Sequence, residues 1–397
     1  MPYLIIFLFS LCFLYRYDIK KKEKYKKSAY FFLFILVVLT AGCRYVVGGD
    51  TVRYMRYWEY YPTFGDDIGI FSYAMYDPFW MLLNVCCKFL CSDFIFFQFV
   101  HALLLNWILF YGVFKRQNIF KEHYFSVVFF YIIYYFIYFN MEVLRESLAV
   151  AIFLLSIPAF QQKKWLKYYL FAVISFLFHS SAIIVFIFPV FRYIAFKKRY
   201  VILTFIFVIT IFILLESSLS VLFVNPIIQQ RFDLYKDASM NFNGRLLRTI
   251  IYFIIPLFII YVNDYRMYRR KKEYIVLYMV FVFVASISAG NTAFGGRFIN
   301  YIAIIIIGYY VHFIYGIRKS LFVKNVQKCV LVLLVIIPFI WTLKSYFGNY
   351  SFILQGKKGY FLWFPYTDVF HIDDSKQKNI IEERIYFADE LMLFQTQ

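Results

Sequence analysis

Trp165–Ala195 reads WLKYYLFAVISFLFHSSAIIVFIFPVFRYIA, a run of 31 residues that is apolar almost throughout. As one helix it would be roughly 46 Å long, whereas the hydrocarbon core of a bilayer is about 30 Å thick. Two shorter helices with a turn at His179–Ser180 fit that thickness better. Pro78–Cys91 is also apolar but too short for a span, as expected of a re-entrant or interfacial segment. These two segments decide which side of a membrane the later loops face.

The whole chain shares this apolar character. Of its 397 residues 63% are hydrophobic, 24% are aromatic and only 16% are charged. A soluble domain has about 25% charged and 45–50% apolar residues, so a soluble fold is excluded. No polar stretch is long enough to form a second domain. We therefore expect one all-α, polytopic transmembrane domain over residues 1–397.

About twelve spanning helices are expected, in addition to the short segment Pro78–Cys91. They are placed at Pro2–Tyr17, Ser28–Cys43, Phe94–Phe114, Tyr124–Phe139, Val143–Phe160, Trp165–Phe178, Ser180–Ala195, Tyr200–Leu215, Leu247–Val262, Tyr274–Gly290, Phe298–Gly316 and Cys329–Leu343.

The net charge of +19 is explained by membrane orientation rather than by nucleic acid. With these spans the basic clusters all fall on one side, which the positive-inside rule assigns to the cytoplasm. The clusters are Lys20–Lys27, Lys115–Lys121, Lys163–Lys167, Arg192–Arg199, Arg266–Lys272 and Arg318–Lys328. Both termini then lie outside the cytoplasm. We expect a multi-pass protein of the bacterial inner membrane with no nucleic-acid partner.

The opposite, outer face holds an unusual set of polar residues. It comprises the loop 44–77, the turn 140–145, the turn at His179, the loop 216–248, the turn 291–297 and the tail 344–397. Arginines at helix ends on this face run against the orientation rule. We therefore expect these arginines to be there for a reason other than membrane orientation.

The first outer loop begins Arg44-Tyr-Val-Val-Gly48-Gly49-Asp50-Thr-Val-Arg53-Tyr54. Its two glycines allow a tight turn that brings backbone N–H groups close to a ligand. Arg44 is a candidate for binding an anion, and Asp50 is a candidate base. The alternative is an ordinary loop with an internal Arg–Asp pair.

Two further candidates lie where later helices meet the outer face. Arg145 follows Glu142 by three residues, so that on one helix both would share a face. Charges beside an apolar segment point to function, although a salt bridge sealing the helix end is the alternative. His179 follows a wholly apolar helix, where it is either a site residue or a helix-packing hydrogen bonder.

Other arginines add cations to the same face, namely Arg231, Arg245, Arg248 and Arg297. A single one can be a side chain reaching for the interface. Several together favour an anion site, because guanidinium groups bind phosphate oxygens bidentately. The chain has no P-loop, no HExxH, no dinucleotide-binding glycine pattern and no GxSxG, and no metal or cofactor is expected.

These motifs resemble the EpsG/Wzy-type polysaccharide polymerases in order and spacing, over nearly the whole chain. The resemblance rests on Arg44 with Gly48-Gly49-Asp50 and Tyr54, on Tyr76-Asp77-Pro78, on Arg145-Glu-Ser-Leu-Ala149, and on Phe178-His179-Ser-Ser-Ala182. Gly296-Arg297-Phe298 and Phe364-Pro365-Tyr366 fit more loosely. Asp77 stands where the family leads us to expect Glu, and Glu146 stands where we expect Gln.

The resemblance implies a glycosyltransferase that polymerises undecaprenyl-diphosphate-linked repeat units of an O-antigen, capsule or exopolysaccharide on the outer face. Arg44, Arg145 and Arg297 would bind the diphosphate, with Arg231, Arg245, Arg248 and Tyr54 as further substrate contacts. Glu142, Asp50 and His179 are candidate bases for the attacking hydroxyl. The expected partners are the lipid-linked oligosaccharide, membrane lipid and a candidate chain-length regulator. A lipid-linked oligosaccharide flippase and an O-antigen ligase are the alternatives.

Overall fold

The computed structural model describes residues 2–64, 77–192, 294–318 and 359–396, with positions 250, 254–255, 259, 336–337 and 340 in addition. Within these ranges the named elements are all helices, joined by turns and loops, and an isolated antiparallel bridge pairs Arg44 with Asp368. The chain divides into two compact units. The first comprises Met1–Ala159, Lys164–Ser180 and Phe339–Gln397, and the second comprises Phe160–Lys163 and Ser181–Pro338.

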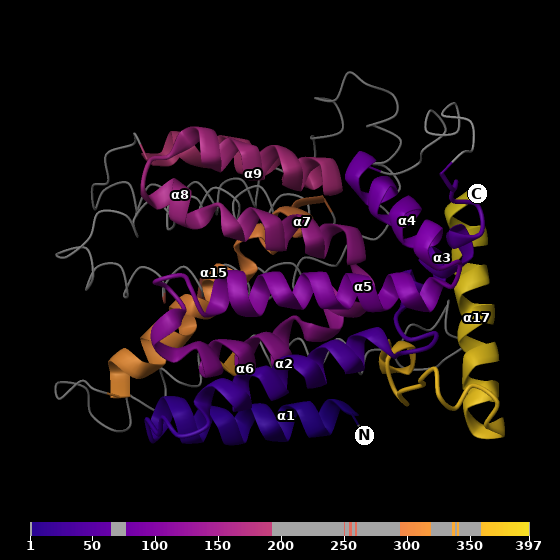
Figure 1. Cartoon of the computed structure of the whole chain (residues 1–397), viewed down its shortest axis with the longest axis horizontal. Helices are drawn as coiled ribbons and strands as arrows, with labels where there is room; N and C mark the ends of the chain where they lie inside the picture. The colour runs from indigo at the N-terminus through magenta and orange to yellow at the C-terminus, as the bar shows by residue number, and fades with distance from the viewer. Residues whose placement is uncertain are drawn as a thin grey trace. The chain divides into compact units, whose positions relative to one another are not determined.

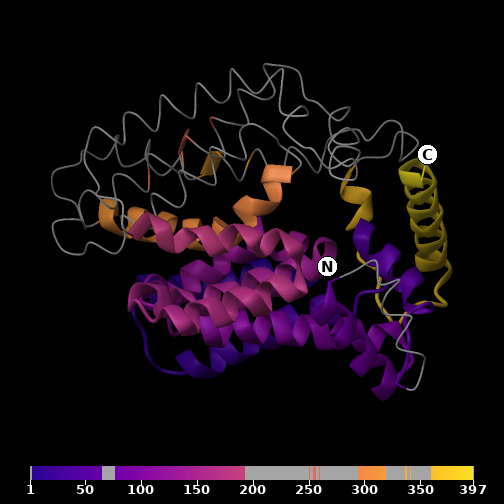
Figure 2. The same ribbon diagram turned by 90° about the horizontal axis from the view of Figure 1, so that it is seen from above.

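The first unit is a bundle of helices that run side by side (Figures 1 and 2). Its long helices are α1 (Pro2–Phe13), α2 (Lys26–Gly42), α5 (Phe94–Trp107), α6 (Tyr124–Tyr134), α7 (Leu144–Leu155) and α9 (Trp165–Phe178). Shorter turns continue or connect them: η1 (Leu14–Ile19), η3 (Ile108–Phe114), η4 (Lys121–His123), η5 (Tyr138–Glu142) and α8 (Ile157–Gln161).

Close approach and buried hydrogen bonds hold α2 against α5. A Cβ atom on Gly42 would lie 2.6 Å from the ring of Phe99, so glycine lets the two helices approach. The Tyr30 hydroxyl donates to the Phe110 carbonyl at 2.8 Å. Gln98 donates to the carbonyls of Gly42 and Arg44, at 2.8 and 2.7 Å. The end of α2 and the start of the first outer loop are therefore fixed to α5.

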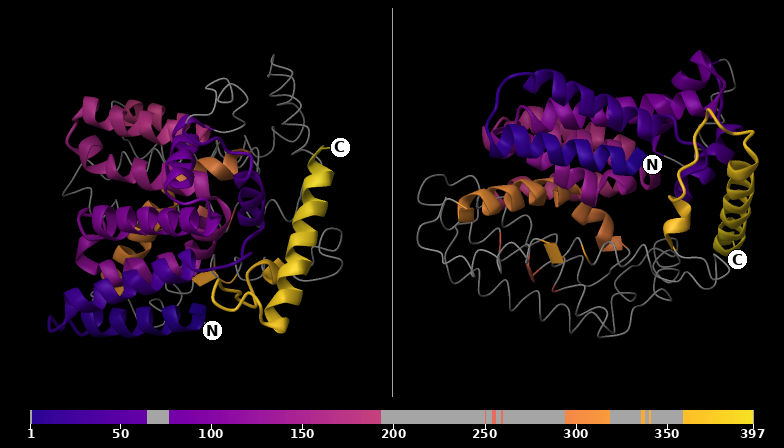
Figure 3. Two further views of the ribbon diagram at one scale, coloured as in Figure 1. Left: turned by 45° about the vertical axis from the view of Figure 1, so that its right-hand side comes forward. Right: turned by 90° about the horizontal axis from the view of Figure 1, so that it is seen from below.

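Four further elements gather at one end of this bundle. They are α3 (Gly49–Trp58), α4 (Pro78–Leu90), η9 (Gly359–Leu362) and α17 (Ser375–Thr396). Helix α17 runs across the axes of the bundle helices at this end (Figures 1 and 3). The connections from η1 to α2 and from η3 to α6 lie at the opposite end, with the basic residues Lys20–Lys27 and Lys115–Lys121. The elements α3, α4, η9 and α17 thus lie at one end of the bundle, and these two basic clusters lie at the other.

The second unit is described at η6 (Ser180–Arg192) and α15 (Phe294–Arg318). The side chains of α15 from Tyr301 to Val311 are all buried. The hydroxyls of Ser181 and Tyr301 lie 2.9 Å apart, which joins the two elements.

Each expected span that the structure describes is helical at least in part, although Tyr124–Phe139 is interrupted after Tyr134, where α6 ends. Among the described residues, four helices are long and apolar enough to cross a membrane: Pro2–Ile19, Phe94–Phe114, Leu144–Gln161 and Arg297–Gly316. Helix α9 ends at Phe178, His179 has extended backbone and η6 follows, so the run Trp165–Ala195 is interrupted where predicted. The total of about twelve spans stays a prediction, because four of them lie wholly or largely outside the described residues.

Two helices were not predicted. Helix α3 lies inside the loop 44–77, and α17 lies inside the tail 344–397. Both helices are polar overall and contain no long apolar run, so a search for spanning segments does not find them. The prediction of one transmembrane domain over residues 1–397 stays a prediction.

Candidate active site

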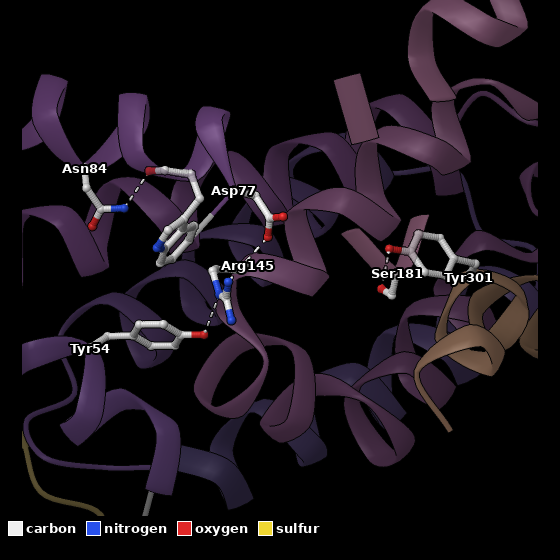
Figure 4. Close-up of polar contacts among 7 residues, drawn as sticks. Tyr54, Asp77, Asn84, Arg145, Ser181 and Tyr301 are labelled. Atoms are coloured by element: carbon white, nitrogen blue, oxygen red, sulfur yellow. Dashed lines mark hydrogen bonds and ion pairs between the residues drawn. The ribbon is translucent and has the colours of Figure 1, made fainter. Parts of the chain in front are cut away.

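The guanidinium of Arg145 is the centre of the candidate site, at the end of the bundle that carries α3 and α4. Arg145 lies in the first turn of α7. Its Nε donates to the Tyr54 hydroxyl at 3.2 Å, and its Nη1 lies 3.4 Å from Asp77 Oδ2 (Figure 4). The Arg145 side chain is 20% exposed and the Asp77 side chain 18%. The pair is therefore anchored in the protein without being sealed from a ligand.

Three different helices bring these side chains together. Tyr54 comes from α3, Asp77 precedes α4, and Arg145 comes from α7. The Tyr54 ring packs against Trp80 of α4 with centroids 5.2 Å apart. Trp80 and Tyr54 are both buried, so this contact fixes α3 against α4. Tyr54 was predicted to contact substrate, and its position beside Arg145 makes it a support for that arginine.

Asp77 is a site residue that the sequence reasoning missed. It was quoted only as part of the Tyr76-Asp77-Pro78 motif. Asp77 is the N-cap residue of α4, with Pro78 at the first helical position, yet its side chain makes no capping hydrogen bond. An aspartate in this position normally accepts from the amides of its own helix. Its carboxylate faces Arg145 instead. The sequence feature that could have identified Asp77 is its position as a carboxylate directly before a short apolar segment.

The N-terminus of α3 holds the carboxylate of Glu142. Glu142 Oε1 accepts from the Gly49 amide at 3.0 Å, and Oε2 accepts from the Asp50 amide at 3.2 Å. The indole of Trp363 donates to Oε1 at 2.6 Å. The predicted approach of glycine-turn amides to an anion is thus seen, with Glu142 as the anion. A carboxylate at this position also complements the helix dipole.

The alternative of a salt bridge between Glu142 and Arg145 was wrong, and so was the prediction that both share one helix face. Glu142 ends η5 and Arg145 lies in α7, with Val143 outside both helices, so the two residues do not share one helical face. The spacing rule for side chains three apart holds only on a continuous helix. Glu142 turns to α3 and Trp363, whereas Arg145 turns to Tyr54 and Asp77.

Burial and, to a smaller extent, the nearby Asp50 carboxylate raise the pKa of Glu142 from its ordinary 4.5 to about 7. The amides of Gly49 and Asp50 and the Trp363 indole act in the opposite direction, because they favour the charged form. Asp50 lies in the first turn of α3. The structure therefore brings two of the three predicted bases, Glu142 and Asp50, to one place.

Arg44 is fully buried and shapes the first outer loop. Its guanidinium donates to the carbonyls of Ala41 and Val47 and, at 3.1 Å, to the Thr51 hydroxyl. Burial lowers its pKa to about 10. Arg44 is therefore not the arginine of an internal Arg–Asp pair in this loop, since these backbone and hydroxyl oxygens are its partners. Its predicted contact with the diphosphate stays a prediction.

His179 is buried at the end of α9, and its amide donates to the Ser175 carbonyl at 3.0 Å. The preceding Phe178 packs against Phe79, with ring centroids 5.7 Å apart. Phe79 belongs to α4, which starts beside Asp77. His179 therefore approaches the α4 side of the site from the end of α9.

The remaining predicted cations lie in the second unit or outside the described residues. Arg297 lies in the first turn of α15 in the second unit, with an exposed side chain. Arg231, Arg245 and Arg248 lie outside the described residues. Their roles stay predictions. Among the residues that the structure describes, no group of three His, Cys, Asp or Glu side chains is arranged to hold a metal ion.

A comparison with family models places residues 27–367 in a match to the EpsG family. This match covers every residue of the candidate site described above. No curated protein and no solved structure matches the chain.

Proposed function

The chain belongs to the EpsG family, and on this premise we propose that it is a membrane-embedded glycosyltransferase that joins lipid-linked oligosaccharide repeat units into a polysaccharide. The donor is a glycan on undecaprenyl diphosphate, and the acceptor is a sugar of a second lipid-linked unit. Family membership and apolar helices support a polysaccharide-polymerase type of function in a membrane. The donor lipid and the face of the membrane are part of the proposal.

The proposed reaction forms one glycosidic bond and breaks one bond between a sugar and diphosphate. A hydroxyl of the acceptor sugar attacks the anomeric carbon of the donor, and the bond from that carbon to the diphosphate oxygen breaks. The hydroxyl proton passes to a base, and the lipid diphosphate leaves with the bonding electrons. Such a site needs cations where negative charge develops on the leaving group and a base near the hydroxyl.

The observation that carries the proposal is the partly exposed guanidinium of Arg145, held between Tyr54 and Asp77. Charge-assisted hydrogen bonds normally measure about 2.7–2.9 Å. At 3.4 Å the contact to Asp77 is loose. We propose that a diphosphate oxygen takes this position when the donor binds. The planar fork of arginine suits two phosphate oxygens at once, which lysine does not.

Asp77, Asp50 and His179 are the candidate bases in this proposal. Both oxygens of Glu142 are used at the N-terminus of α3, so we assign Glu142 to positioning. Asp77 joins the candidates because its carboxylate lies next to the proposed diphosphate site. The phosphate contacts proposed for Arg44 and Arg297 are secondary to that of Arg145.

We further propose that the reaction takes place on the outer face of the bacterial inner membrane. The separation of the polar end of the bundle from Lys20–Lys27 and Lys115–Lys121 supports this assignment, because clustered lysines favour the cytoplasmic side. The substrate would then reach Arg145 from the outer leaflet. A chain-length regulator is the proposed protein partner.

Surface glycan from a deletion strain tests the proposed function. A polymerase predicts glycan that stops at one repeat unit, with long chains restored by the wild-type gene but not by Arg145→Ala. Loss of all surface glycan would indicate a flippase instead. Accumulation of long lipid-linked chains that are never attached would indicate a ligase. Either result would overturn the proposal.

A further inference from the structure

The chain that follows the last expected span returns to the candidate site. Residues 359–384, here called the C-terminal clamp, run beside the first outer loop. The Tyr45 amide donates to the Thr367 carbonyl at 3.0 Å, and the Val369 amide donates to the Cys43 carbonyl at 3.1 Å. The Gly48 amide donates to the Leu362 carbonyl at 2.9 Å. The clamp is thus hydrogen-bonded to the loop directly before α3 begins.

Arg384 of α17 holds the clamp together from inside. Its side chain is only 1% exposed. The guanidinium donates to the carbonyls of Phe361, Pro365 and Val46, at 2.8, 2.6 and 3.1 Å, and to the Thr367 hydroxyl at 3.0 Å. One buried cation therefore joins three points of the clamp to one point of the first outer loop. Burying the charge of an arginine is costly unless oxygen atoms accept its hydrogen bonds. With four such partners, Arg384 fixes the positions of the chain segments around it.

The loop residue that Arg384 binds is itself strained. Val46 has φ +51°, in the left-handed region that β-branched residues avoid. Such a conformation persists only where the surroundings fix it, and it is found at functional sites more than elsewhere. Val46 is buried with Val52 of α3 and Ile381 of α17, flanked by Tyr45, Met55 and Ile385. Apolar packing and the Arg384 hydrogen bond therefore fix the same residue.

A second connection runs from the clamp to α3 through Glu142. Trp363 of the clamp donates to the Glu142 carboxylate, which in turn accepts from the first amides of α3. Helix α3 carries Tyr54, whose hydroxyl accepts from Arg145. The clamp thus contacts α3 both through the loop before it and through the carboxylate at its N-terminus.

We propose that the C-terminal clamp is a positioning element of the active site, in which Arg384 and Trp363 hold α3 where Tyr54 orients Arg145 for the diphosphate. This inference rests on the proposed function. Neither Arg384 nor Trp363 touches the substrate in this account. They act on diphosphate binding only through α3 and Arg145.

A double-mutant cycle on the full-length purified protein tests the inference, with undecaprenyl diphosphate as the probe. The variants are Arg384→Lys, Arg384→Ala and Trp363→Phe, each made alone and together with Arg145→Ala. Lys378→Ala is the matched control, because it removes an exposed cation from the same helix. Thermal melting measures folding in each variant. If Arg384→Ala fails to fold, Trp363→Phe still tests the inference, because it removes only one hydrogen-bond donor.

We expect Trp363→Phe and Arg384→Lys to weaken probe binding by about two- to thirtyfold, the range seen for residues coupled to a site they do not touch. In the Arg145→Ala background the same changes should have almost no effect, because the group they orient is gone. The control should bind like the wild type. The KM for lipid-linked repeat units should rise and kcat should fall in folded variants.

Wild-type affinity in folded Arg384→Lys and Trp363→Phe would overturn the inference. So would an equal loss of affinity with and without Arg145, since the clamp would then act elsewhere. If the wild type does not bind the probe, or Arg145→Ala binds it as well as the wild type, the proposed diphosphate site fails and the clamp's role falls with it. The wild-type and Arg145→Ala measurements therefore distinguish the two failures.

Discussion

At the residue scale, the arginines at this end of the bundle differ in burial: some hold the structure together from inside, whereas Arg145 stays partly exposed. Arg44 and Arg384 are almost fully buried, and their partners are backbone carbonyls and hydroxyls. Arg145 is partly exposed beside a carboxylate. Sequence reasoning singled out both Arg44 and Arg145, because each lies at the outer end of an apolar segment. It did not single out Arg384, because an arginine in a polar tail carries no signal without its three-dimensional partners.

Tyr54→Phe tests the support of Arg145. The substitution removes the hydroxyl that accepts from Arg145 Nε and leaves the ring packed on Trp80. One hydrogen bond of this kind contributes about 0.5–1.5 kcal/mol, so kcat/KM should fall by about two- to tenfold. Melting should stay close to that of the wild type. Tyr60→Phe, at a ring that is 79% exposed, is the matched control. Equal activity of both variants would contradict the role of Tyr54.

Glu142→Gln tests the buried carboxylate through the pH dependence of stability. The pKa of Glu142 is raised on folding, from about 4.5 to about 7, so its protonated form is favoured in the folded protein. Its contribution to stability is therefore fully present below pH 4.5 and is lost as the pH rises to about 7. Gln has no such titration. The melting temperature of the wild type minus that of the variant should fall between pH 5 and pH 7.5, and a rise would contradict the assignment.

At the element scale, the bundle helices were predictable and the helices that build the site were only partly so. Apolar runs specify the bundle helices because nothing else satisfies backbone groups in a bilayer. The bounds of α5 with η3, and of α9, agree with the predicted ranges. Helix α3 was not predicted, since its residues are largely polar and its position depends on Glu142 and the C-terminal clamp. Both partners lie far from it in the sequence.

The turn into α3 depends on a glycine for steric reasons. Gly48 has φ +98°, and a Cβ atom there would lie 2.2 Å from the Met141 carbonyl oxygen. Gly48→Ala should therefore destabilise the protein by about 2 kcal/mol or more and lower polymerisation. Gly316→Ala is the matched control, because nothing lies within 4 Å of its added Cβ. That change in α15 should be neutral or slightly stabilising. Equal melting temperatures of Gly48→Ala and Gly316→Ala would contradict the steric role of Gly48.

At the scale of the whole molecule, the proposed reaction on the outer face requires that the end of the bundle with α3 and α4 faces out of the cell. Single cysteines at Thr63 and Lys24, in a cysteine-free background, test this directly. Thr63 follows α3 and is exposed, whereas Lys24 lies in the basic turn before α2. An impermeant thiol reagent should label the cysteine at position 63 in intact spheroplasts and label the one at 24 only after lysis. The reverse pattern would place the site on the cytoplasmic side.

The central claim is that Arg145 binds the diphosphate of a lipid-linked donor during glycan polymerisation. The most direct test is the chain length of the product that purified Arg145→Lys and Arg145→Ala make from undecaprenyl-diphosphate-linked repeat units. Arg145→Lys keeps the charge but loses the planar fork, so it should remain folded and polymerise about ten- to a hundredfold more slowly, with Arg145→Ala slower still. Product ladders of normal length and rate from folded Arg145→Ala would contradict the claim.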